Sequence, residues 1–327
     1  MIRTAIIGYG NLGKGAEAAV AAAPDMELTA VFTRRNPEAL QVQTPGVPVY
    51  AYAELAKKAK DIDVVILCGG SATDLPEMTP EVARLCTVVD SFDTHAHIPQ
   101  HFAAVDAAAK AGGNIAVIST GWDPGLFSIA RLYANIALPS GTDYTFWGRG
   151  VSQGHSDAIR RIPGVKDARQ YTVPVKEAVD RVRNGENPVL TTRDKHTREC
   201  WVVAEEGADL EAIRQAIVTM PNYFDEYDTT VNFISEEKLL RDHAGLPHGG
   251  SVIRSGVTGW NGKYQDTVEF SLKLDSNPFF TGSVMTACAR AAYRLKEKGE
   301  TGCRTLFDIP PALLSDRSPE DLRAHLL

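Results

Sequence analysis

Two aspartates follow predicted strands at positions where they could hold an ammonium group. Asp93 lies in the segment Ser91-Phe92-Asp93-Thr94-His95, and Asp123 lies in Gly121-Trp122-Asp123-Pro124-Gly125. Carboxylates at this edge of a sheet could position a substrate carbon for hydride transfer, a reaction in which a nicotinamide cofactor supplies the chemistry. Two alternatives remain open: nearby Asp90 could act in the same way, and an aspartate before a helix can simply cap it.

A glycine-rich motif, Gly8-Tyr9-Gly10-Asn11-Leu12-Gly13, follows the first predicted strand and opens the first predicted helix. Gly8 permits a tight turn, Gly10 lets the backbone approach a pyrophosphate, and Gly13 lets helix and strand pack closely. The helix N-terminus then faces the phosphates. This setting favours dinucleotide binding over an ordinary glycine-rich turn.

The residues after the second predicted strand indicate which dinucleotide binds. Enzymes that use NAD usually have an acidic residue there, which accepts a hydrogen bond from the ribose 2′-hydroxyl. This chain has Thr33-Arg34-Arg35 instead, and arginine forms charge-assisted, often bidentate bonds to phosphate oxygens. The pattern favours NADP, although two arginines on a solvated turn would give the same sequence.

The segment 68–73 follows the fourth predicted strand and consists of small and hydroxyl-bearing residues. Such residues could line the cofactor at the carboxyl edge of the sheet, or they could form a plain connecting loop. The candidate cofactor contacts in it are Cys68, Gly69, Ser71, Ala72 and Thr73.

A polar, glycine-rich run over residues 146–157 is typical of a binding loop. Trp147 within it supports this interpretation, since a large aromatic side chain beside glycines usually packs on something. Further along, Thr172, Arg198 and His248 supply hydroxyl, guanidinium and imidazole donors for a carboxylate. The alternatives are a solvated, outward-facing Arg198 and a turn role for His248.

The first third of the chain alternates short β-branched runs with alanine-rich amphipathic stretches, which is typical of βαβ units. The predicted strands cover residues 4–8, 27–33, 47–50, 64–68, 88–91 and 115–119. The predicted helices cover residues 12–23, 53–60, 80–86 and 99–111. These elements predict an α/β fold, with a Rossmann-type doubly wound parallel sheet over residues 1–120.

After a predicted helix over residues 126–138, the strand-like runs become longer and alternate more regularly. They cover residues 144–147, 170–173, 196–204, 229–233, 252–256 and 267–274, with helices at 177–183, 210–220 and 283–298. This pattern predicts a second, α+β domain over residues 121–302, packed against the first around a cleft. The segment 303–327 is expected to dock back on the first domain.

The composition is that of a globular protein with a small partner. Hydrophobic residues make up 44% and charged residues 23%, and the net charge of -7 disfavours nucleic acid or an anionic membrane as a partner. The eight histidines show no metal-binding spacing and the five cysteines contain no C-x-x-C pair, so we predict no metal and reduced, buried thiols. With no signal-like or spanning segment, we expect a cytoplasmic protein.

Eight segments, taken in order along the chain, resemble the meso-diaminopimelate dehydrogenase family. They are residues 8–13, 71–74, 119–125, 145–148, 152–157, 160–165, 247–250 and 272–275. The resemblance implies an NADP-dependent oxidoreductase of lysine biosynthesis that reversibly deaminates meso-2,6-diaminopimelate at its D-centre. Its products would be ammonia and L-2-amino-6-oxopimelate, which cyclises to tetrahydrodipicolinate. The stretch 257–265 is slightly longer than in the family pattern.

The resemblance also implies roles for individual residues. Those implied for the reacting D-amino end are Asp93 and Asp123, and those for the middle of the site are Trp147 and Gln153. Those implied for the distal L-end are Thr172, Arg198, His248 and Asn277. Gly121 joins the cofactor contacts, and the family implies a homodimer in which the second domain binds substrate and mediates dimerisation.

Three other functions fit parts of the pattern. A broad-specificity NADP-dependent D-amino acid dehydrogenase or a dihydrodipicolinate-type reductase would share the nucleotide motif, and preference for the meso compound would separate them from the family activity. A non-catalytic NADP-sensing protein would also keep the motif. It would give no purpose to Asp93, Asp123, Arg198 and His248, which together match a substrate-binding pattern.

Overall fold

The computed structural model describes residues 1–327 and divides them into two compact units. Unit 1 combines Met1–Ile129 with Pro278–Leu327, and unit 2 is the continuous segment Ala130–Asn277. These bounds differ from the predicted division at residues 120 and 302. The second boundary differs because helix α11 (Asn277–Glu297) buries its apolar side chains on the sheet of unit 1.

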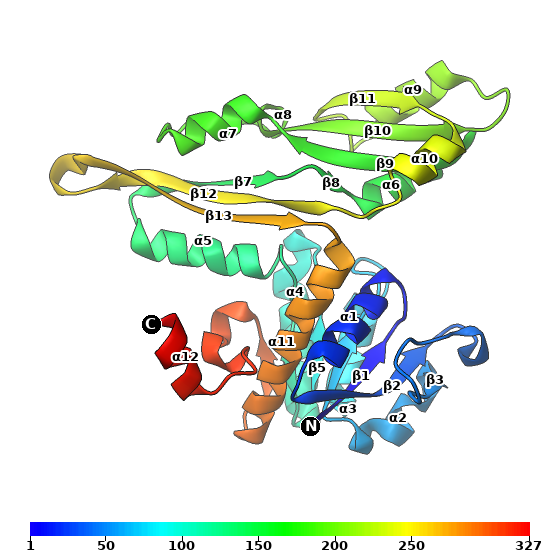
Figure 1. Ribbon diagram of the computed structural model, residues 1–327, viewed down its shortest axis with the longest axis vertical. Helices are drawn as coiled ribbons and strands as arrows, with labels where there is room; N and C mark the ends of the chain where they lie inside the picture. Colours follow the sequence, from blue (N-terminus) through cyan, green and yellow to red (C-terminus); the bar gives the residue numbers. More distant parts are fainter. The chain divides into compact units, whose positions relative to one another are not determined.

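Unit 1 contains a seven-stranded sheet in the order β14-β6-β5-β4-β1-β2-β3. Of these strands, β1, β2, β3 and β5 are labelled in Figure 1. The strands are β1 (Ile2–Ile7), β2 (Met26–Thr33), β3 (Val49–Ala51), β4 (Val64–Leu67), β5 (Val88–Asp90), β6 (Ile115–Val117) and β14 (Gly302–Arg304). All neighbours run parallel. The prediction of a doubly wound Rossmann-type sheet is confirmed. The strand order reverses between β1 and β4, where sheets of this kind bind dinucleotides at their carboxyl edge.

Side chains alternate across this sheet into two cores, one on each face. Helices α2 (Leu55–Lys58), α3 (Leu75–Leu85) and α4 (Ile98–Gly112) contribute to one core, and α1 (Asn11–Ala22) and α11 contribute to the other. Every residue of β4 is buried. Its continuous apolar sequence therefore reflects a strand that is covered on both sides.

Helix α3 begins earlier than the sequence pattern indicates. The sequence pattern predicts this helix over residues 80–86, although proline would also suit the first turn of a helix that starts earlier. The helix instead starts at Leu75, has Pro76 in its first turn, and carries Pro80 in its interior. Burial of Leu75 and Met78 accompanies this longer helix and offsets the backbone hydrogen bond that Pro80 cannot donate.

The C-terminal segment returns to unit 1, where β14 pairs with β6 and α12 (Pro319–Leu326) follows. Arg290 of α11 donates to both carboxylate oxygens of Asp25, at 2.7 and 2.8 Å, and to the Leu314 carbonyl at 2.9 Å. Helix α11 therefore ties the C-terminal segment to the turn before β2.

Unit 2 contains two smaller sheets, in the orders β11-β10-β9-β8 and β13-β12-β7. The strands are β7 (Gly141–Trp147), β8 (Gly150–Val151), β9 (Val165–Pro174), β10 (His196–Ala204), β11 (Asp228–Phe233), β12 (His248–Thr258) and β13 (Tyr264–Leu274). All pairs are antiparallel except β10 with β11. This is the predicted α+β architecture, and the stretch 257–265 forms the tip of the long β12–β13 hairpin.

The predicted polar loop over residues 146–157 is more ordered than its sequence indicates. It contains the end of β7, all of β8 and the first turn of α6. Short polar sequences of this kind lack the periodicity that reveals elements, so β8 and α6 were not predicted. The helices of this region are α5 (Leu126–Ala137), which crosses the unit boundary, α6 (Gln153–Arg160), α7 (Lys176–Arg183), α8 (Thr192–Lys195), α9 (Leu210–Val218) and α10 (Glu236–Asp242).

Three further observations concern membranes, metal ions and cysteine thiols. No helix combines the length and the apolar character needed to cross a membrane. No group of three or more His, Cys, Asp or Glu side chains gathers in a way that could hold a metal ion. All five cysteines are free thiols, and burial raises the pKa of Cys86 to about 11.

Candidate active site

The glycine-rich motif forms a tight turn between β1 and α1. Gly8 has a φ of 88°, and a Cβ there would lie 2.7 Å from the carbonyl oxygen of Cys68. A Cβ at Gly13 would overlap the Gly8 carbonyl oxygen, so both positions need glycine. At Gly10 a Cβ would meet no atom within 4 Å. The turn is thus tightly packed on the protein side and open at Gly10, and this shape fits a pyrophosphate at the N-terminus of α1.

Arg34 and Arg35 contact the loops around this turn. Arg35 Nη2 donates to the Tyr9 carbonyl at 2.7 Å, and the Arg35 N–H donates to the Thr33 hydroxyl at 3.0 Å. Arg34 Nη2 lies 2.7 Å from Asp74 Oδ1 and remains largely exposed. Two guanidinium groups and a hydroxyl therefore gather at the end of β2, a donor set that suits a 2′-phosphate.

The loop after β4 links the predicted cofactor-binding residues to Asp93. Asp74 Oδ2 accepts from the Gly70 N–H at 2.8 Å, so the carboxylate that pairs with Arg34 also shapes this loop. Ser71 Oγ accepts from the Asp93 N–H at 2.8 Å. The remaining predicted cofactor residues at this edge are Asn11 and Leu12 at the start of α1, half-buried Cys68 and Gly69, exposed Ala72 and Thr73, and buried Gly121.

Asp93 lies beyond the carboxyl end of β5 and is exposed. The short helix that follows is capped at Thr94 and has no side-chain cap hydrogen bond, so the capping interpretation of Asp93 is wrong. Its carboxylate makes no hydrogen bond or ion pair within the chain and is available to a cation.

Asp123 lies half-buried in a compact loop between β6 and α5. Trp122 forms a bridge with Gly125, and the Leu126 N–H donates to the Gly121 carbonyl at 3.0 Å. The Asp123–Pro124 peptide is cis. The two backbone contacts from Trp122 and Leu126 hold Asp123 beyond the carboxyl end of β6, which neighbours the strand that precedes Asp93.

Asp90 is not an available acid. Its side chain is fully buried and accepts hydrogen bonds from the Thr79 hydroxyl at 2.8 Å and from the backbone N–H groups of Phe92 and Ser119. The expectation that it could compete with Asp93 is therefore wrong, because all its acceptor capacity is directed into the protein.

In unit 2, Arg198 is a buried cation with no acidic partner. It is 5% exposed, so the solvated, outward-facing alternative is wrong. Its guanidinium carbon lies 3.8 Å from the centre of the Tyr227 ring, it donates to Thr172 Oγ1, and its Nε has no partner. Burial lowers the pKa of Arg198, which marks the cost of holding this charge without a counter-ion.

Two of the other predicted L-end residues, Thr172 and His248, are connected to Arg198 through neighbouring strands. Arg198 pairs with Thr172, and Thr172 pairs with Gly150. A Cβ at Gly150 would meet the His248 imidazole at 2.5 Å, so only glycine lets His248 approach this closely. The Asn277 N–H donates to the Leu246 carbonyl at 2.9 Å, near His248 at the start of β12. The structure thus brings Thr172, Arg198 and His248 together, and His248 is not a turn residue.

Trp147 is held by His196, which the sequence analysis did not single out. His196 Nε2 accepts from the Trp147 N–H at 2.8 Å, and the two rings stack with centroids 5.2 Å apart. Burial, followed by the nearby charges of Arg198 and Lys195, lowers the pKa of His196 to about 3. The neutral imidazole is therefore the form that accepts this hydrogen bond.

Gln153 opens α6 and is exposed. Ser152 caps this helix, and its Oγ lies 2.7 Å from His155 Nδ1. Burial and the charge of Arg198 lower the pKa of His155 to about 4. His155 and His196 are therefore both neutral, and both lie near the guanidinium of Arg198, which has no counter-ion.

Sequence reasoning missed Asp74, His196 and Tyr227. His196 and Arg198 are two residues apart in β10, so the period-2 alternation that places both on one face could have found His196. Asp74 belongs to a segment that resembles the family and could have been carried over from it. Tyr227 lies outside any motif and had no such signal.

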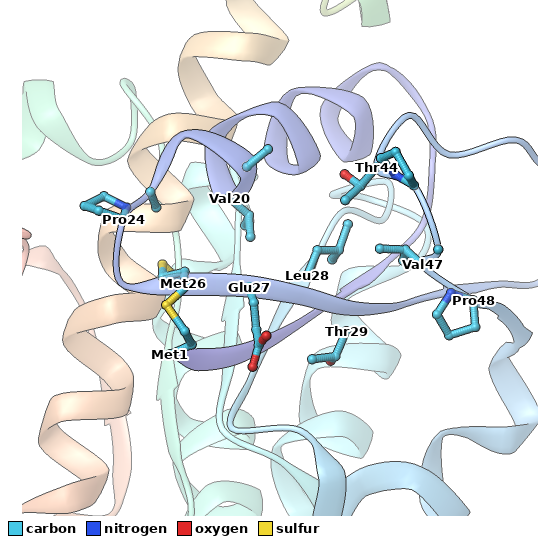
Figure 2. A pocket seen from close by; sticks show the side chains of 14 residues that line it. Met1, Val20, Pro24, Met26, Glu27, Leu28, Thr29, Thr44, Val47 and Pro48 are labelled. Carbon is cyan, nitrogen blue, oxygen red and sulfur yellow. The ribbon is translucent and has the colours of Figure 1, made fainter.

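A pocket of about 450 Å³ lies elsewhere on unit 1 (Figure 2). It is formed by the end of α1, the first residues of β2 and residues 44–48, at the amino edge of the sheet. Glu27 has the only charged side chain among its lining residues, and none of the predicted site residues lines it. It is therefore separate from the cofactor edge.

Two family models match successive parts of the chain. Residues 2–117 match the oxidoreductase family with an NAD-binding Rossmann fold. Residues 121–276 match the diaminopimelic acid dehydrogenase C-terminal domain. The Rossmann sheet, the open glycine turn and the first match define a dinucleotide-dependent oxidoreductase.

Full-length relatives define the family more narrowly. The meso-diaminopimelate D-dehydrogenase of Lysinibacillus sphaericus is 62% identical over 100% of this chain and 99% of its own length. That of Corynebacterium glutamicum is 49% identical over 99% and 98%. The chain belongs to the meso-diaminopimelate D-dehydrogenase family, as the sequence resemblance predicted.

Solved structures agree with this assignment. A mutant meso-diaminopimelate dehydrogenase from Clostridium tetani, crystallised with diaminopimelate, has a TM-score of 0.93 and 51% identity, with 100% of each chain covered. An engineered D-amino acid dehydrogenase bound to NADP+ has a TM-score of 0.88 and 47% identity, and covers 100% of this chain and 99% of its own.

Proposed function

We propose that this protein is an NADP-dependent meso-diaminopimelate D-dehydrogenase. It catalyses the reversible oxidative deamination of meso-2,6-diaminopimelate at its D-centre, giving ammonia and L-2-amino-6-oxopimelate, in lysine biosynthesis. The observation that carries the proposal is identity of 62% over the whole chain to a relative with this activity in its name. The chemistry of the site supports it, because the substrate carries ammonium groups and carboxylates while the chain offers both acids and donors.

NADP suits the residues at the carboxyl edge of unit 1. The turn at Gly10 would hold the pyrophosphate, and Thr33, Arg34 and Arg35 would bind the 2′-phosphate. When bound, NADP accepts the hydride that leaves the D-centre carbon. The loop with Ser71 and the segment with Gly121 would border the nicotinamide end.

Asp93 and Asp123 would bind the reacting D-amino end. The exposed Asp93 carboxylate suits an ammonium group, and half-buried Asp123 would attract the same group or accept its proton. Once the carbon has lost its hydride, the resulting imine takes up water, and ammonia leaves. Trp147 and Gln153 would shape the middle of the site.

The L-end would bind in unit 2. Its carboxylate would supply the counter-ion that Arg198 lacks, with Thr172 and His248 beside it and Asn277 near the amine. A meso compound held at its L-end can present only its D-centre for reaction, which would explain the stereochemistry.

The protein is also proposed to be a cytoplasmic homodimer. Exposed apolar side chains gather on α5 and β13 of unit 2, where a second copy would cover them. They are Leu132, Tyr133, Ile136, Val268 and Phe270. The five free cysteines suit the reducing cytoplasm.

One experiment tests the proposal directly. Purified protein is supplied with NADP or NAD and with meso-, LL- or DD-diaminopimelate or a simple D-amino acid, and absorbance of the reduced nicotinamide is followed. Reduction with meso-diaminopimelate and NADP is expected. A comparable rate with the simple D-amino acid would favour the broad dehydrogenase, and silence with every diaminopimelate despite NADP binding would overturn the function.

A further inference from the structure

Asp90 forms a buried hub at the end of β5. Its Oδ2 accepts from Thr79 Oγ1 at 2.8 Å and lies 2.7 Å from His101 Nε2. A carboxylate only accepts hydrogen bonds here, so His101 donates through Nε2–H. Phe92 stacks on the His101 ring with centroids 4.1 Å apart. The hub is thus enclosed by side chains from α3 and α4.

The other oxygen of Asp90 joins two loops that are distant in the sequence. Its Oδ1 accepts from the Phe92 N–H at 3.0 Å and from the Ser119 N–H at 2.9 Å. The Asp90 carbonyl accepts from the Thr120 N–H at 2.9 Å and from its hydroxyl at 2.7 Å. Phe92 is one residue before Asp93, and Thr120 is three residues before Asp123. One residue therefore anchors the backbone that carries both acids.

The backbone at the second anchor is strained. Ser119 has a φ of 57°, in the left-handed region that residues other than glycine seldom adopt. Strain of this kind persists only where surrounding contacts fix the conformation. The hydrogen bonds from Ser119 and Thr120 to Asp90 provide such contacts, so the path of the chain toward Asp123 depends on Asp90.

We infer that Asp90 is a positioning residue for the dehydrogenase reaction, an inference that rests on the proposed function. Its buried carboxylate holds the segments that carry Asp93 and Asp123 at a fixed spacing, so that both can face one substrate ammonium group. Asp90 does not touch the substrate. Hydride transfer is sensitive to errors in placement, so loosening this hub slows that step more than it weakens cofactor binding.

The test compares Asp90→Ala with Asp90→Asn in the full-length protein. The asparagine keeps an oxygen for the Phe92 and Ser119 amides, whereas alanine keeps none. For Asp90→Ala we expect kcat to fall about 100-fold, with NADP affinity by calorimetry within about threefold of the parent. The deuterium isotope effect on kcat, with substrate labelled at the D-centre, should rise because hydride transfer becomes rate-limiting. Asp90→Asn should stay within about tenfold of the parent and keep its isotope effect.

A purely structural role would give a different result. It would lower kcat in proportion to the folded fraction and leave KM and the isotope effect unchanged, which overturns the inference. If Asp90→Ala does not fold, Thr120→Val decides, since it removes a hydrogen bond between Asp90 and the segment that carries Asp123: a raised isotope effect supports the inference and an unchanged one overturns it. Lack of diaminopimelate oxidation by the parent enzyme would instead overturn the proposed function, and this inference with it.

Discussion

In unit 1 the buried carboxylate of Asp90 accepts hydrogen bonds from two side chains and two backbone amides, whereas in unit 2 the buried guanidinium of Arg198 has no acidic partner. The first charge is satisfied by the protein, and its role is to fix the loops of the reacting end. The charge of Arg198 has no counter-ion within the chain, so a bound ligand would have to neutralise it. Tyr227, Thr172 and two neutral histidines surround it without supplying a negative charge.

Under the proposed function, this difference divides the work of recognition between the two ends of the substrate. Rigid loops at the reacting end give precise placement before substrate arrives. Burying a cation without a counter-ion lowers stability, and in the proposed complex a substrate carboxylate would relieve part of this cost at Arg198. Substrates that lack a distal carboxylate should therefore lose much of their transition-state stabilisation. The following variants test each side of this division.

The largest effect is expected at the reacting end. Asp123→Asn removes a proton acceptor and a negative charge from the predicted D-amino site, so kcat should fall about 1000-fold. Steady-state kinetics with meso-diaminopimelate would measure it, and Asp93→Asn serves as the matched control for loss of charge alone. Near-normal turnover of Asp123→Asn would rule out its role as the base.

Variants at the residues proposed to bind the L-end should change the preference between substrates. Arg198→Met together with His248→Asn should lower kcat/KM for meso-diaminopimelate about 100-fold and relax the preference over a simple D-amino acid. The free energy of unfolding of Arg198→Met should be unchanged or higher, because an unpaired buried cation is replaced by an apolar side chain. An unchanged meso preference would contradict the assignment of both residues.

Variants at the predicted 2′-phosphate site should have a smaller effect, which is on cofactor preference, and should not change binding of either end of the substrate. Arg34→Ala together with Arg35→Ala should reduce the preference for NADP over NAD about 30-fold, through loss of the charge-assisted bonds to the 2′-phosphate. Calorimetric titration with each dinucleotide would measure it. Thr33→Val is the milder control, and equal losses for NADP and NAD would show that the arginines do not read the phosphate.

The smallest effect concerns pH. His155 and His196 have pKa values lowered by burial to about 4 and about 3, below the ordinary value of 6.5. As the pH falls through 6.5, the unfolded chain takes up protons first, so stability is present above that value and is lost below it. The loss should reach about 1 kcal/mol per histidine near about pH 5.5. Thermal melts across this range should show a shallower dependence for His196→Gln, and a pH-independent Tm would contradict the burial of neutral imidazoles.

Much of unit 1 could be predicted from the sequence because its signals are local. The motif Gly8 to Gly13 lies in one turn, and the apolar residues of β4 need no partner to reveal a buried strand. The approximate positions of Asp93 and Asp123 followed from the same strand pattern. What the pattern could not show is that Asp90, in the same segment as Asp93, is wholly enclosed, because its donors come from Thr79, His101 and Ser119.

Unit 2 was harder to predict because its site depends on contacts between residues that are distant in the sequence. Arg198 alternates within β10 as a solvated arginine would, and only the pairing of β10 with β9 places it against Thr172. The contact of Gly150 with His248 joins residues nearly a hundred positions apart. Helix α11 has a clear helical sequence. Its assignment to unit 1 depends on its packing against one face of the unit 1 sheet, whose strands are distant in the sequence.

Because α11 belongs to unit 1, folding of unit 1 cannot be completed until late in synthesis. On the ribosome, Met1–Ile129 emerges first, while Pro278–Leu327 follows only after all of unit 2. Until then, one face of the Rossmann sheet lacks Met285, Ala289 and the rest of the α11 surface that completes its core. The nascent chain therefore carries an uncovered apolar sheet face while unit 2 is translated, and such a face can bind chaperones or promote aggregation. A frameshift that deletes α11 would therefore damage a unit whose other strands and helices are mostly encoded before unit 2.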